Sequence, residues 1–162
     1  MAKENLLNLI SNKDVLHFSC PASFDPTSPL KSGLVLYELE EGDEVYPEDM
    51  LSALDILTTA LKADLVTLSS TEIIPDAEAQ GADLIGLTYP FLYAGAASEI
   101  ISLWWADVES TEELMLDFYR NLLQGKRDKV DVLRQAQLDI MRKKEYEHPF
   151  HWAPFILIGN YR

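Results

Sequence analysis

The chain has 162 residues, 48% of them hydrophobic and 25% charged, which is typical of one globular domain with a buried core. Its 13 lysine and arginine residues against 27 aspartate and glutamate residues give a net charge of −14. This charge repels nucleic acid and anionic membranes, so we expect neither as a partner. A single cysteine, Cys20, and the lack of an N-terminal signal pattern predict a cytoplasmic protein without disulfides.

Segments of helix and strand type alternate through the first half of the chain, as judged from hydrophobic spacing and from proline and glycine positions. They are a helix over 3–12, a strand over 14–20, a loop over 21–29, a strand over 32–39 and a helix over 47–61. Pro47 and the two acidic residues after it suit the first turn of the last of these helices.

The same alternation continues in the second half. The predicted elements are a strand over 63–70, a helix over 81–96, a strand over 98–105, helices over 110–123 and 127–144, and a closing strand over 154–159. Pro90 should kink the first of these helices or mark a boundary, and Gly95 suits its C-terminus. Ser110 and Glu113 form a capping-box pattern for the next helix, which Gly125 ends.

Strands that alternate with helices predict a parallel or mostly parallel sheet with helices on both faces, in one α/β domain over 1–162. Ligands and chemistry in such a sheet lie at the carboxyl ends of the strands. Two of these ends carry notable residues, with Cys20 and Pro21 after the first strand and Ser70 and Thr71 after the third. The sequence therefore places a candidate site at these two strand ends.

Long stretches of the sequence, from about Val15 to Gly159, resemble the CHAT domain, a caspase-like, clan CD fold related to caspases and separases. The stretches are "PLKSGLVL", "ADLVTLSS", "GLTYPFLYAGA", "ISLWWADVESTEELMLDFY", "LRQAQLDI" and "HPFHWAPFILIG". The resemblance implies a three-layer sandwich in which helices cover both faces of a mostly parallel central sheet. CHAT domains usually carry further N-terminal elements, so the chain is either a minimal version or a piece of a longer protein.

Active members of this family carry a motif similar to "HFACHG", whose second histidine is the general base, and one similar to "LSACxTG", whose cysteine is the nucleophile. Here "HFSCPA" has Pro21 at the base position and Ala22 at the glycine. The stretch "LSSTEII" has Thr71 at the nucleophile position and Ile74 at the glycine. The resemblance therefore implies a pseudo-peptidase that is not an enzyme and that binds, scaffolds or regulates a protein or peptide partner.

The other nucleophilic and metal-binding residue types do not indicate a second catalytic or metal site. His17 and Cys20 fall on opposite faces of a strand, so we expect a buried structural histidine and cysteine, not a base and a nucleophile. A hydrolase that uses Thr71, or residues that the sequence does not identify, is the alternative function. Three scattered histidines and one cysteine match no metal-ligand spacing, and no phosphate-binding glycine motif is present, so we expect no metal and no cofactor.

Trp104, Trp105 and Asp107 follow the fourth predicted strand. In caspase-like folds this region borders the substrate cleft, so the resemblance implies that Trp104 and Asp107 line a remnant cleft together with Pro21 and Thr71. The alternative is that one tryptophan simply covers the end of the sheet. The sequence identifies neither the partner nor the oligomeric state.

Overall fold

The structure is a computed structural model and describes residues 3–25, 27–36, 46–69, 73–74, 83–104, 106–125 and 127–162. The expectations for Thr71, for Trp105 and for the end of the strand at 32–39 fall outside the described residues. All statements below refer to the described part of the chain.

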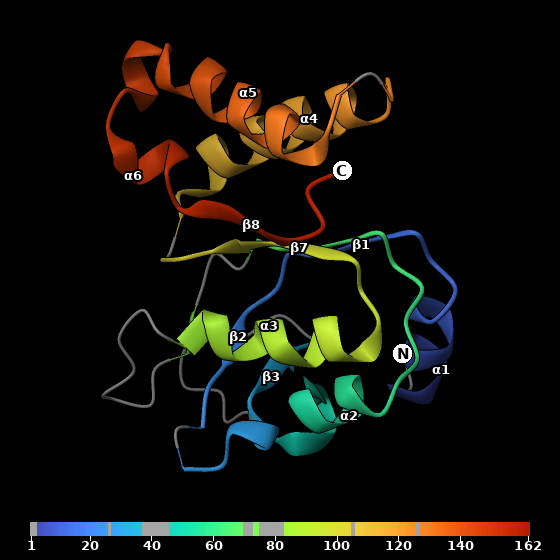
Figure 1. Cartoon of the computed structure of the whole chain (residues 1–162). Coiled ribbons are helices and arrows are strands. Elements are labelled where there is room, and N and C mark those ends of the chain that lie inside the picture. The colour runs from blue at the N-terminus through green and yellow to red at the C-terminus, as the bar shows by residue number, and fades with distance from the viewer. Residues whose placement is uncertain are drawn as a thin grey trace.

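A sheet in the strand order β1-β5-β7-β8 forms the middle layer of the molecule (Figure 1). Its strands are β1 (Val15–Phe18), β5 (Leu65–Leu68), β7 (Ser98–Ser102) and β8 (Phe155–Gly159). The first three are parallel, and β8 pairs with β7 in the antiparallel direction. The expectation of a mostly parallel sheet is therefore confirmed.

Helices cover both faces of this sheet, as Figure 1 shows. One face carries α4 (Val108–Leu122), α5 (Lys129–Met141), the turn η3 (Lys144–Tyr146) and α6 (Pro149–Trp152), and the other carries α1 (Lys3–Ile10), α2 (Ala53–Leu57) and α3 (Asp83–Ala94). Alternate strand residues point to opposite faces. Leu65 and Ile100 accordingly pack in the cluster with α4 and α5, whereas Val66 and Ile101 pack in the cluster with α1, α2 and α3. These layers form the expected α/β sandwich.

A second, smaller sheet, which the sequence did not predict, has the strand order β4-β3-β2-β6. Its strands are β2 (Ala22–Ser23), β3 (Gly33–Val35), β4 (Met50–Ser52) and β6 (Ile73–Ile74), and a short turn, η1 (Pro29–Lys31), lies between β2 and β3. The segment 21–29 is therefore not loop throughout. Gly33 allows β3 and β4 to approach closely, because a Cβ at this position would lie 2.4 Å from the Leu51 carbonyl oxygen.

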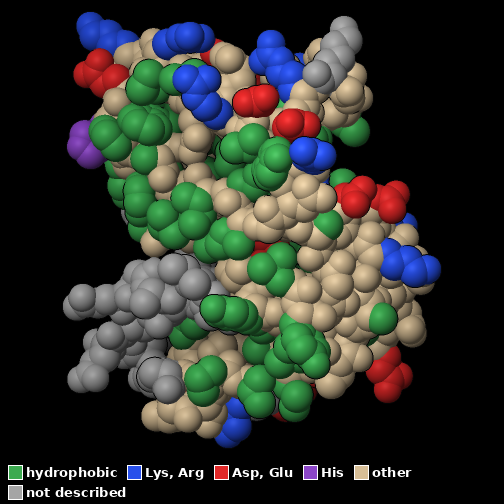
Figure 2. Space-filling model, in the orientation of Figure 1, with side chains coloured by type: hydrophobic (Ala, Val, Ile, Leu, Met, Phe, Trp, Pro, Cys, Tyr) green, Lys and Arg blue, Asp and Glu red, His purple; other side chains and the backbone are tan. Residues whose placement is uncertain are grey.

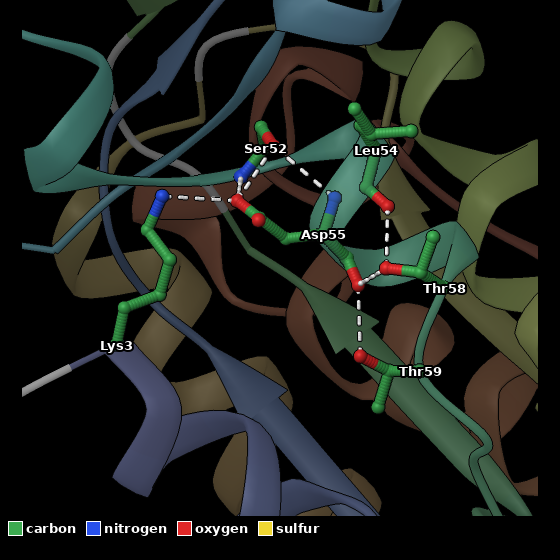
Figure 3. Close-up of polar contacts among 6 residues, drawn as sticks. All are labelled: Lys3, Ser52, Leu54, Asp55, Thr58 and Thr59. Atoms are coloured by element: carbon green, nitrogen blue, oxygen red, sulfur yellow. Dashed lines mark hydrogen bonds and ion pairs between the residues drawn. The ribbon is translucent and has the colours of Figure 1, made fainter.

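The helix expected over 47–61 is wrong. This segment begins with the 3₁₀ turn η2 (Pro47–Asp49), continues as β4, and becomes helical only at α2. Ser52 is the N-cap residue of α2: its hydroxyl accepts the Asp55 N–H at 3.2 Å, and the Asp55 carboxylate accepts the Ser52 N–H at 3.0 Å (Figure 3). Strand pairing of Leu51 with Leu34 has overridden the helix signal at Pro47.

Asp55 also connects α1 to α2. Lys3 Nζ lies 3.0 Å from Asp55 Oδ2, and the Ser52 hydroxyl donates to the same oxygen at 2.6 Å (Figure 3). Burial alone raises the pKa of Asp55, but the hydrogen bonds from Ser52 and Lys3 outweigh it and leave the pKa lowered. The carboxylate is therefore more stable in the folded protein than in the unfolded chain.

The helices expected over 3–12 and 127–144 end earlier, at Ile10 and Met141, and the start of α4 also differs from expectation. Asp107 caps α4, because its Oδ2 accepts the Ser110 N–H at 2.9 Å, and Ser110 itself is fully buried within the helix. The capping-box expectation for Ser110 and Glu113 is therefore wrong. The helix α3 continues through Pro90, and Gly95 ends it with a φ of +117°, as a helix-terminating glycine allows.

Glu99 is a carboxyl group in the middle of the sheet. It pairs with Val66 on one side and Ile158 on the other, and it faces the same side as Ile101. Its side chain is fully buried, and neither carboxyl oxygen has a hydrogen-bond partner among the described residues. Burial raises the pKa of Glu99 to about 9, so the group is neutral at pH 7.

The Asp55→Ala variant should lower the free energy of unfolding by about 1–2 kcal/mol at pH 7, since it removes the carboxylate's hydrogen bonds with Ser52 in the capping box and the Lys3 ion pair. The pKa is lowered in the fold, so this contribution is present above the ordinary carboxyl pKa and is lost as the pH falls through the lowered value. Urea denaturation measures the change. Lys3→Met, which keeps the capping box, serves as the comparison variant, and an Asp55→Ala protein of unchanged stability would contradict the assignment.

The Glu99→Met variant should stabilise the protein, and increasingly so as the pH rises. An unfolded glutamate ionises near its ordinary pKa, whereas the folded protein keeps this proton up to about pH 9. The wild type therefore loses about 1.4 kcal/mol of unfolding free energy for each pH unit between these values. Urea denaturation of both proteins at pH 5, 7 and 8 gives the difference in their free energies of unfolding. The contributions of the other titrating groups cancel in this difference. A difference that stays constant over this range would show that Glu99 is not buried as a neutral acid.

Candidate functional site

The two motifs that the sequence singled out lie where β1 and β5 end. Phe18 pairs with Leu68 in the main sheet, and Ala22 pairs with Ile73 in the second sheet, both in parallel. Pro21 lies between these two ladders, and its carbonyl oxygen accepts the Val35 N–H at 2.8 Å. Position 71 falls between the same two ladders in the sequence but lies outside the described residues, so its assignment stays a prediction.

His17 and Cys20 lie on opposite sides of the strand, as expected. Cys20 packs against the apolar cluster that contains Phe91, whose ring centroid is 5.6 Å from that of Phe18. Burial raises the pKa of the Cys20 thiol to about 11, which suppresses the reactive thiolate at neutral pH. Both residues are less buried than expected, because Cys20 is only half-buried and much of the His17 side chain is exposed.

The inner side of the His17 ring takes part in a small polar network. Its Nε2 lies 2.6 Å from the Ser69 hydroxyl oxygen, and its ring centroid lies 5.5 Å from that of Tyr119. The Tyr119 hydroxyl in turn donates to Thr67 Oγ1 at 2.8 Å. Burial of this side of the ring lowers the pKa of His17, so the imidazole is neutral at pH 7.

Sequence reasoning did not identify Ser69. The signal lies in the strand register: His17 pairs with Thr67, and Ser69 is two residues further along the same face. The pair has the distance of a nucleophile and its base. Ser69 is nevertheless only 2% exposed, and no described residue bonds the His17 Nδ1 to orient the ring as a catalytic base requires. We interpret the pair as structural.

A groove of about 380 Å³ lies between these strand ends and α4. His17 and Ser69 line it from the sheet, and Glu112, Leu116 and Tyr119 line it from the helix. It is at the carboxyl end of the parallel strands, where ligands bind in open α/β sheets. We call it the α4 groove.

A sequence profile of the CHAT domain matches residues 1–160, which is nearly the whole chain. The chain belongs to the CHAT family. It is similar to tetratricopeptide repeat protein 28 of Mus musculus, with 37% identity over 117 residues, and to that of Homo sapiens, with 34% identity over 113 residues. Each match covers 70% of this chain and 4% of the relative, so the chain spans about 4% of the length of these relatives.

The other two candidate residues of the CHAT domain, Trp104 and Asp107, are not among the described residues that line the α4 groove. Trp104 donates from Nε1 to the Phe150 carbonyl oxygen at 3.3 Å and lines a separate apolar hollow with His148 and Pro149. Hydrophobic side chains gather around α6 in the face shown in Figure 2. No described contact joins Trp104 to Pro21, so a shared cleft stays a prediction.

Asp107 has a structural role at the start of α4. Its hydrogen bond from the Ser110 N–H outweighs its partial burial and lowers the pKa of the carboxyl group. Both Ser110 Oγ, at 3.2 Å, and Asp107 Oδ2, at 3.8 Å, face the same nitrogen of His151, Nδ1. A catalytic triad needs the two groups on different ring nitrogens, so these three residues do not form one.

In the described part of the CHAT domain, no helix has the length and apolar character needed to span a bilayer. The same residues contain no group of three or more histidine, cysteine or carboxylate side chains placed to hold a metal ion.

The native CHAT domain should react with iodoacetamide at Cys20 roughly 100-fold more slowly at pH 8 than a free cysteine does, because its raised pKa leaves little thiolate. Intact-mass spectrometry over time measures the rate. The same protein in denaturant is the control and should react at the ordinary rate. Fast alkylation of the native protein would contradict a raised pKa of this half-buried thiol.

Proposed function

We propose that this CHAT domain is a pseudo-peptidase, which binds an extended peptide or protein segment and does not cut it. The observation that carries the proposal is Pro21, which the motif resemblance puts at the position of the family's general base. Proline has no side-chain acceptor and no backbone N–H, so it can neither take nor relay a proton. The Pro21 carbonyl is engaged by Val35.

The remaining nucleophile types near the site do not replace the lost chemistry. Cys20 is a half-buried thiol with a pKa of about 11, on the face away from His17. Ser69 is nearly inaccessible although it contacts His17. A groove can still bind a peptide after its chemistry is lost, because a peptide can pair with exposed strand backbone and place side chains in nearby pockets.

The relatives support a role in protein interaction. Their name describes tetratricopeptide repeat proteins, and repeats of this kind stack into extended concave surfaces that bind other proteins. We infer that a CHAT domain in such a context docks or regulates a protein partner, and we keep the expectation of a cytoplasmic location. A hydrolase with Thr71 as nucleophile remains the second candidate.

Restoring the family's residues tests the loss of chemistry. We would compare the wild type, the double variant Pro21→His with Thr71→Cys, and a variant that also carries Ala22→Gly and Ile74→Gly. Each is treated with peptide acyloxymethyl ketone, fluorophosphonate and β-lactone probes, and with a diverse peptide library. Intact-mass spectrometry reports labelling, and peptide sequencing by mass spectrometry reports cleavage.

We expect a silent wild type and labelling of at least one restored variant at the Thr71→Cys position. Labelling of the wild type at Thr71 or Ser69, or cleavage by it, would overturn the pseudo-peptidase proposal. Binding is tested separately by fluorescence anisotropy of the same library with the wild type. Failure of every library peptide to bind would overturn the peptide-binding part of the proposal.

A further inference from the structure

We draw no further inference here: the strongest candidate, the surface patch that Tyr89 and Tyr93 form on the outer face of α3, is an exposed apolar helix face, and nothing in the described part of the chain shows what covers it.

Discussion

β1 and β5 run side by side in parallel, with His17 opposite Thr67 and Phe18 opposite Leu68. These two strands come from distant parts of the sequence, and their register decides which of their side chains can meet. Alternation sends His17, Thr67 and Ser69 toward α4, while Phe18 enters the apolar core on the other side. At these strand ends, the face toward α4 is therefore polar and the opposite face is apolar. Reacting side chains at these strand ends must lie on the same face, because side chains on opposite faces cannot contact each other.

The backbone between the two sheets is itself heavily engaged. Ala22, at a position where the family resemblance places a glycine, is fully buried and pairs with Leu34 on one side and Ile73 on the other. The Pro21 carbonyl is bonded to Val35. A catalytic turn must leave backbone groups available to a substrate. The backbone groups at positions 21 and 22 are instead bonded to strands of the small sheet.

Sequence patterns predicted the elements with a long, clear period. β5 is apolar except for Thr67, β7 has Ile100 and Ile101 at its centre, and α4 has a strong amphipathic pattern, so all three are expected within a few residues of their observed limits. β2 and β6, with two residues each, are too short to show any period. The capping box of Ser52 and Asp55 was present in the sequence, but the proline at 47 suggested an earlier helix start. The pairing of β4 with β3 decides between a helix start at Pro47 and one at Ser52.

The sequence likewise predicts some features of the candidate site and not others. The position of Pro21 at a strand end followed from the chain order, whereas the contact of His17 with Ser69 depends on the register between two strands, which no local pattern gives. Trp104 and Asp107 follow the correct strand, but α6 and the start of α4 engage them. Sequence order locates the end of a strand, and packing decides which way its side chains turn.

Glu99 couples the folding of this domain to the proton concentration of its surroundings. Each chain that folds at neutral pH takes up close to one proton from the solvent, since the buried carboxyl group is neutral and the unfolded one is ionised. Acidification therefore acts on the equilibrium as an added ligand would, by favouring the state that binds the proton. The heat of unfolding measured at neutral pH will accordingly include the ionisation heat of the buffer that accepts this proton.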